Sequence, residues 1–169
     1  MHGLIYTFIT SIFISTGDPL SLLLLMFILL ILYFMVRNIE ASQGTKFLFV
    51  LYIISCLFTA LFYFLLRFSL ISIYPIDTLI QPIGLAWGGI LGLLAYSLFP
   101  IMNQKITAFM YFLPIRMSGR SFLIFIVILR LLPVIFFVWY YPFYVIIYLP
   151  DLGGILGAYI IYRYKFNLR

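Results

Sequence analysis

Long uncharged apolar stretches most strongly limit what this chain can fold into. Residues 19–36, 47–66, 78–104 and 131–150 contain no Asp, Glu, Lys or Arg. A helix needs about 20 predominantly apolar residues to cross the hydrocarbon core of a bilayer, which is roughly 30 Å thick. Stretches of this length therefore predict an integral membrane protein in contact with the lipid bilayer.

The composition supports the same class and excludes others. Hydrophobic residues make up 66% of the chain and charged residues 8%, whereas a soluble domain is about half apolar and a quarter charged. No soluble face gathers the Lys and Arg residues, so we expect no nucleic acid as a partner. With one cysteine, Cys56, and one histidine, His2, the sequence offers no metal-ligand cluster and no cofactor motif. We predict neither metal nor cofactor.

Charge and turn signals divide the chain into six predicted spans. They are residues 3–16, 19–36, 47–67, 79–100, 121–142 and 144–162. The first span is short, about 21 Å at 1.5 Å per residue, so a chain of five complete spans remains open. No internal repeat or soluble domain is visible. We predict an all-α integral membrane protein with one transmembrane domain over residues 1–169.

The basic residues orient this arrangement. In a six-span chain, eight of them fall on one side: Arg37, Lys46, Lys105, Arg116, Arg120, Arg163, Lys165 and Arg169. Asp18, Asp77 and Asp151 fall toward the other side. Lys and Arg are enriched in cytoplasmic loops, so both termini are predicted to be cytoplasmic. The connection over residues 99–121 is predicted to lie along the cytoplasmic interface, with Pro100 and Pro114 as helix breakers.

Glycines recur at helical spacing in two of the predicted spans. Three lie in the fourth span and three in the sixth: Gly84, Gly88, Gly92, Gly153, Gly154 and Gly157. Membrane helices approach one another closely through stripes of small residues, because lipid provides no hydrophobic drive between helices. We therefore predict that these glycines pack the fourth and sixth helices together.

Two charges, Arg130 and Asp151, interrupt the last two apolar spans. Measured from the cytoplasmic ends at 1.5 Å per residue, Arg130 lies about 14 Å deep and Asp151 about 18 Å deep. The two side chains could pair inside the protein, or Arg130 could meet an acidic residue of another protein's helix. Asp151 follows Pro150, so it could instead cap the sixth helix. A fourth interpretation places Asp151 beside a water-filled cavity, since a membrane carboxylate suggests a functional site.

Three motifs carry a family resemblance. "RNIEASQGTKFLFVLYIIS" places Glu40, Gly44 and Lys46 before the third span. "GLAWGGILGLLAYSLFP" is followed by "FLPIRMSGRSF", which contains Pro114 and Arg116, and "DLGGILG" opens the sixth helix. In order and location these motifs resemble the rhomboid superfamily of intramembrane serine proteases and their inactive relatives. The resemblance implies a six-helix bundle in which the fourth and sixth helices touch and the fifth forms a lateral gate to lipid.

The catalytic positions of that family are not retained. A rhomboid protease pairs a serine on the fourth span with a histidine on the sixth. The resemblance places Trp87, or Ala86 with a shift of one, at the serine position and Asp151 at the histidine position. None of these residues provides the nucleophile and base of a protease, which implies a pseudoprotease. Trp87 could fill the vacated cleft or donate its indole N–H to Asp151.

Three classes of function follow from these features. The resemblance implies a non-catalytic protein that binds transmembrane helices of other membrane proteins, in quality control, trafficking or assembly. The second is a small fixed subunit of a larger membrane complex, in which Arg130 meets an external acid. An active protease or a transporter is disfavoured, because Ser55, Thr59 and Ser97 have no histidine to activate them and neither repeated halves nor broken helices are visible.

Overall fold

The computed structural model describes residues 39–70, 84–110, 113–139 and 143–167, together with Met26, Tyr33, Val36 and Arg37. The regular secondary structure of the described part is helical apart from one β-hairpin. The first predicted span and all but three residues of the second lie outside these residues, as do Asp18, Asp77, His2 and Arg169.

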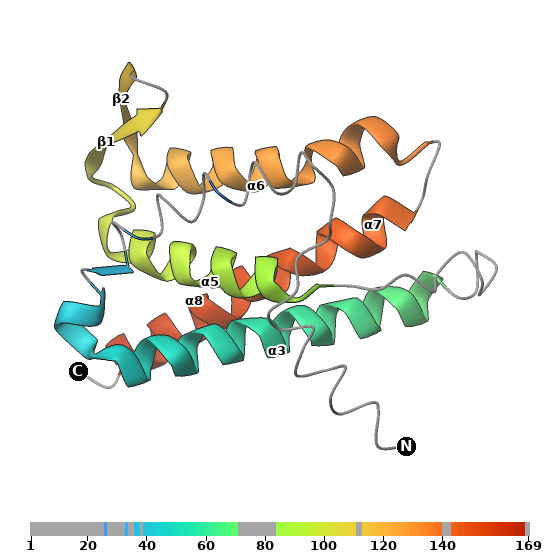
Figure 1. Ribbon diagram of the computed structural model, residues 1–169, viewed down its shortest axis with the longest axis horizontal. Coiled ribbons are helices and arrows are strands. Elements are labelled where there is room, and N and C mark those ends of the chain that lie inside the picture. The colour runs from blue at the N-terminus through green and yellow to red at the C-terminus, as the bar shows by residue number, and fades with distance from the viewer. Residues whose placement is uncertain are drawn as a thin grey trace.

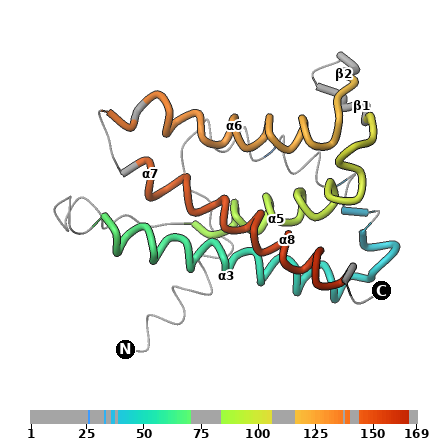
Figure 2. Tube along the Cα trace, turned by 180° about the vertical axis from the view of Figure 1, so that it is seen from behind, coloured from blue at the N-terminus to red at the C-terminus, as the bar shows by residue number. Residues whose placement is uncertain are grey.

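The helices lie side by side in two layers (Figures 1 and 2). Helices α3, α5 and α8 pack against one another, and α6 lies across α5 as an outer layer. The helical elements are α3 (Thr45–Leu70), α5 (Ala86–Leu98), η1 (Phe99–Ile101), α6 (Gly119–Phe137), α7 (Phe143–Tyr148), η2 (Leu149–Asp151) and α8 (Leu152–Asn167). Strands β1 (Lys105–Met110) and β2 (Leu113–Ser118) form the hairpin between η1 and α6.

Three helical segments of the described chain are long and apolar enough to cross a membrane. They are Thr45–Leu70, Gly119–Phe136 and Tyr144–Lys165, which correspond to the third, fifth and sixth predicted spans. Helical structure and membrane-compatible length are therefore confirmed for these segments. The last segment is interrupted at η2, because Pro150 has no N–H to continue the α-helical hydrogen bonds.

The fourth predicted span, residues 79–100, differs from the observed helix. Residues 84 and 85 are not helical, and α5 begins at Ala86. The apolar helical segment Ala86–Ile101 is shorter than the three above. Sequence accounts for the late start, because Pro82 and Gly84 both disfavour a helix interior. Gly84 therefore lies outside the helical stripe in which it was predicted.

Glu40 and Gly44, which are four residues apart in the first sequence motif, form the turn that leads into α3. Gly44 has a φ of +84°, a left-handed conformation that glycine adopts without steric cost. Its N–H donates to the Glu40 carbonyl at 2.8 Å, and the Thr45 hydroxyl donates to the Glu40 carboxylate at 2.7 Å. Glu40 and Gly44 therefore join the preceding helical turn to α3. Lys46 is exposed at the first turn of α3.

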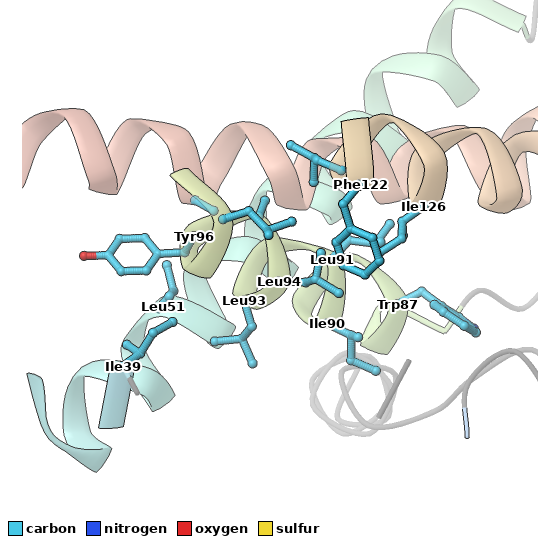
Figure 3. Close-up of a cluster of buried hydrophobic side chains, with 14 residues drawn as sticks. Ile39, Leu51, Trp87, Ile90, Leu91, Leu93, Leu94, Tyr96, Phe122 and Ile126 are labelled. Carbon is cyan, nitrogen blue, oxygen red and sulfur yellow. The ribbon is translucent and has the colours of Figure 1, made fainter. Parts of the chain in front are cut away.

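Helix α5 forms the centre of the core. Every residue of α5 except Ser97 is buried, as expected for a helix that is apolar on all sides and covered on all sides. Leu51 of α3, Phe122 and Ile126 of α6, and Ala158 of α8 pack around it in one cluster. Figure 3 shows α3 and α6 side chains converging on α5.

Most of the predicted glycines lie where helices approach closely. A Cβ atom at Gly154 would overlap the Gly88 carbonyl oxygen, and one at Gly92 would overlap the Ser55 side chain. An added Cβ atom would meet residues of α3 at three further glycines. At Gly88 it would meet Thr59, and at Gly153 and Gly157 it would meet Phe58. Gly88, Gly92 and Gly154 thus lie where α5 and α8 approach each other, whereas Gly153 and Gly157 face α3 instead and Gly84 precedes the helix. The same stripe on α5 also includes Gly89, which faces Tyr52 and Cys56.

One end of the bundle carries most of the described positive charge. The first turn of α3, the end of α5, the start of α6 and the end of α8 lie at this end (Figure 1). These termini carry Lys46, Arg120, Arg163 and Lys165, and Lys105 begins β1 shortly after α5 and η1. Arg67 lies in the last turn of α3, at the opposite end. Five of the eight basic residues that were predicted to lie on one side therefore share one end of the described fold.

The connection from α5 to α6 contains strands that were not predicted. Pro100 lies in η1 directly after α5, as a helix breaker would. Pro114 instead lies within β2, opposite Phe109 of β1. Isoleucine, threonine and phenylalanine are enriched in strands, so the residue types Ile106, Thr107 and Phe109 provided a signal that sequence analysis did not use.

Candidate functional site

Arg130 and Asp151 form a buried ion pair between α6 and η2. The Arg130 Nε atom donates to the Asp151 Oδ2 atom at 2.7 Å. The side chains are 3% and 1% exposed. The internal pair, one of the alternatives from sequence analysis, is therefore present, and the similar depths expected for the two residues agree with it.

Two aromatic rings complete the surroundings of the guanidinium. The Arg130 Cζ atom lies 4.2 Å from the centroid of the Trp87 ring and 4.4 Å from that of the Tyr148 ring. Both aromatic residues are buried. A guanidinium is planar and weakly hydrated, so it stacks on aromatic faces in a way that a lysine ammonium does not. The rings and the carboxylate together offset part of the cost of burying this charge.

Four elements contribute to this cluster, which we call the Arg130 cluster: Trp87, Arg130, Tyr148 and Asp151. Trp87 comes from the first turn of α5, Arg130 from the middle of α6, Tyr148 from the end of α7 and Asp151 from η2. The cluster therefore connects the outer helix α6 with the inner bundle.

Sequence analysis missed Tyr148. It lies three residues before Asp151, and residues three apart are neighbours on the same helical face. That spacing was the available signal. By contrast, Trp87 was singled out, and its ring contacts Arg130. Donation from its indole N–H to Asp151 stays a prediction.

The other interpretations of Asp151 have different outcomes. Asp151 directly precedes α8, where a negative charge interacts favourably with the positive end of the helix dipole. Its carboxylate accepts a hydrogen bond from Arg130, and capping of the helix by this side chain stays a prediction. At 1% exposure, the side chain has no room for surrounding water. The interpretation as a polar point in a water-filled cavity is wrong in this structure.

Two of the three hydroxyl groups singled out from the sequence make local hydrogen bonds. Thr59 Oγ1 donates to the Ser55 carbonyl at 2.9 Å, and Ser97 Oγ donates to the Leu94 carbonyl at 2.7 Å. Ser55 Oγ is fully buried and has no hydrogen-bond partner. The described ranges contain no histidine, and in them no three His, Cys, Asp or Glu side chains converge as metal ligands.

A second polar contact lies at the basic end of the bundle. Gln43 Oε1 accepts hydrogen bonds from Tyr96 OH at 3.1 Å and from Lys165 Nζ at 2.9 Å. The Lys165 ammonium also lies 4.1 Å from the centroid of the Phe47 ring. These contacts join the chain before α3 to α5 and α8. No motif in the sequence indicated them, because the residues are far apart along the chain.

Comparison with known proteins identifies no relative. No protein-family model matches the chain, no curated protein is similar to it, and no solved structure matches its fold. The rhomboid resemblance therefore stays a prediction based on the sequence motifs.

Proposed function

We propose that this chain is a non-catalytic, rhomboid-like, multi-pass membrane protein that binds transmembrane helices of other membrane proteins. The proposal includes six spans, cytoplasmic N- and C-termini and a single domain over residues 1–169. Its cytoplasmic side is the end of the bundle that carries Lys46, Lys105, Arg120, Arg163 and Lys165, in keeping with the positive-inside rule. The proposed partners are helices that reach the protein laterally through the bilayer.

The observation that carries the proposal is the arrangement of α6. Its outer face exposes Ile124, Ile128, Leu132 and Ile135, which are spaced by four, four and three residues and so share one stripe. Its inner face carries Arg130 into the buried cluster. The apolar outer stripe offers a surface to another helix in the bilayer, and the buried charge on the same helix offers a means of selecting it.

The Arg130 cluster suggests how such docking could select its partners. An unpaired guanidinium is costly in a low-dielectric interior, so α6 cannot leave the bundle unless a new acceptor replaces Asp151. A helix with its own Asp or Glu at similar depth would provide that acceptor. Pro133 lies one turn after Arg130 within α6 and removes one backbone hydrogen bond, which lowers the cost of bending the helix there.

Photocrosslinking tests lateral docking at α6. A photoreactive amino acid at Ile128, which is 52% exposed, is expected to capture many membrane proteins after mild-detergent purification from native membranes. The matched control is the same amino acid at Leu61 on the outer face of α3, which is 53% exposed. We expect at least several times more crosslinked protein at Ile128, identified by mass spectrometry. Equal capture at the two positions would contradict docking at α6.

A second candidate function is that of a fixed accessory subunit. It is favoured by the exposed apolar side chains on α3 as well as α6, among them Phe64 and Phe68, because a stable partner could cover both faces. In the crosslinking experiment, one partner at fixed stoichiometry from both positions would support this function instead. An active protease or a transporter is not proposed.

Absence of proteolysis is expected from the residues that occupy the catalytic positions implied by the resemblance. Trp87 and Asp151 both contact Arg130, and neither supplies a serine–histidine pair. In proteoliposomes, we expect no cleavage of permissive rhomboid substrates above that of protein-free vesicles, with an active rhomboid protease as the positive control. Cleavage abolished by mutation of one serine would contradict the pseudoprotease proposal.

A further inference from the structure

A cavity lies at the basic end of the bundle, between the helical turn that precedes α3 and the end of α5. Its volume is about 270 Å³, and it is lined by residues of the turn 39–43, of α5 and of η1. These segments lie next to one another in Figures 1 and 2. Pockets for complete small molecules measure roughly 300–1,000 Å³. This cavity therefore suits one part of an elongated ligand.

The lining combines apolar side chains with neutral polar ones. Ile39 and Tyr96, which are 7% and 2% exposed, form its base, and Figure 3 shows both side chains. Pro100 and Ser42 are exposed at its mouth. None of the described residues that line the cavity is charged. The lining fits an uncharged, largely apolar group, since an unpaired charge is costly to desolvate.

Gln43 gives this lining a hydrogen-bond donor for a ligand. The Lys165 ammonium can only donate, so its contact at 2.9 Å fixes the side on which Gln43 Oε1 lies. Tyr96 OH donates to the same oxygen at 3.1 Å. In the described part of the chain, no group accepts from the two N–H bonds of Gln43 Nε2. Gln43 lines the cavity, so a ligand there can accept from that nitrogen.

The hydroxyl protons of the two serines in the lining are already used. Ser42 Oγ donates to the Ile39 carbonyl at 3.1 Å, and Ser97 Oγ donates to the Leu94 carbonyl at 2.7 Å. Each hydroxyl has one proton to donate. Among the described residues of the lining, Gln43 is therefore the donor that selects the ligand. The group it requires is an acceptor oxygen on an otherwise apolar molecule.

We propose that the cavity binds a glycerolipid of the cytoplasmic leaflet, with Gln43 Nε2 donating to an ester carbonyl. The start of the acyl chain lies against Ile39, Tyr96 and Ile101, and the headgroup remains outside the mouth. The inference rests on the membrane insertion and orientation proposed above, which place the basic helix ends at the interface between headgroups and hydrocarbon. Ester carbonyls lie at that level and combine an uncharged acceptor with an apolar chain. A water-soluble sugar would leave most of its polar groups unpaired in this lining.

Two lipids that differ only in the ester carbonyls test the assignment. The protein is purified in mild detergent and mixed with equal amounts of a diester phosphatidylcholine and the diether phosphatidylcholine of the same chain length. Native mass spectrometry then measures the lipid that the protein retains. We expect at least about threefold more of the diester lipid, as one additional hydrogen bond of typical net strength would give. Equal retention of the two lipids would overturn the site.

Gln43→Glu removes the donor and keeps the acceptor. Glutamate retains two oxygens for Tyr96 and Lys165, so the Tm of the variant should be no lower than that of the unsubstituted protein. The preference for the diester lipid is expected to disappear. A preference that persists in this variant would overturn the role of Gln43.

Ser42→Trp tests the cavity without changing Gln43. A tryptophan at the exposed mouth is expected to block entry and abolish the preference for the diester lipid. The matched control is Ala41→Trp, because Ala41 is an exposed neighbour that does not line the cavity. A preference that persists in Ser42→Trp would place the bound lipid elsewhere on the protein and overturn the site.

Failure of the proposed membrane insertion would be recognised separately. Release of the chain from native membranes by alkaline carbonate would overturn insertion and the lipid site together. A chain that stays in the membranes but retains the two lipids equally would overturn the lipid site alone. Photocrosslinking at Ile128, which does not line the cavity, should be unchanged in Gln43→Glu. That result keeps the lipid site distinct from the proposed helix binding.

Discussion

Asp151→Ala is expected to lower the thermal stability of the detergent-solubilised protein more than any other single change of a charged residue. The substitution leaves Arg130 buried without its acceptor at 2.7 Å. Removing one partner of a buried ion pair costs about 3–5 kcal/mol, because the remaining charge is uncompensated. Thermal unfolding followed by circular dichroism in one mild detergent measures the effect as a fall in Tm.

Two further variants separate the ion pair from helix capping. Asn caps a helix as well as Asp does but carries no charge, so Asp151→Asn should be nearly as destabilising as Asp151→Ala if the pair dominates. The double variant Arg130→Met with Asp151→Leu should recover much of the stability, since apolar replacement of a whole buried pair is often neutral or stabilising. Unchanged stability of Asp151→Ala would contradict both the ion-pair and the capping interpretations.

The buried pair was foreseeable from the sequence because charge is costly inside a membrane protein. With only two charges in the last two apolar stretches, and similar calculated depths, Arg130 and Asp151 had few possible partners. Tyr148 was harder to foresee, because its three-residue spacing from Asp151 was the one signal. The chain has 14 Tyr and 19 Phe, so composition gave no reason to choose Tyr148 over the others. Only the packing of α6 and α7 brings its ring beside Arg130.

Helices were predictable where apolar length alone determines them, as in α3 and α6. The predicted helix bounds were wrong where a Gly or Pro residue interrupts the helix within an apolar stretch. Non-helical residues at 84 and 85 shorten the fourth helix, and η2 divides the sixth predicted span. A hydropathy argument does not distinguish an apolar helix from an apolar turn, whereas Gly and Pro do so through conformational freedom and a missing N–H.

The hairpin was missed for a different reason. Apolar residues alternate along β1 and β2 with a period of two, but the alternation is short and Phe109 and Pro114 interrupt its polar face. Short apolar runs are ambiguous between helix and strand. The connection was predicted to lie at the membrane interface without any assignment of its secondary structure. That location stays a prediction.

Gly154→Ala is the second substitution expected to have a large effect, and it acts on packing rather than charge. The new Cβ atom would overlap the Gly88 carbonyl oxygen. The Cβ atom has a fixed position on its own backbone and the carbonyl oxygen is part of the other helix's backbone, so neither can rotate away and α5 and α8 must move apart. Added volume in a packed core typically costs about 1–3 kcal/mol and occasionally more. Because the atom that the new Cβ meets is backbone, we expect at least the upper part of that range.

Gly157→Ala is the matched control on the same helix. Its Cβ would lie 3.0 Å from the Phe58 ring, a side chain that can shift by a few tenths of an ångström. Both substitutions gain the same helix propensity, about 1 kcal/mol relative to glycine, so their difference in Tm isolates the backbone clash. We expect a much lower Tm for Gly154→Ala than for Gly157→Ala in the same detergent. Equal Tm values would contradict the close approach of α5 and α8 at these glycines.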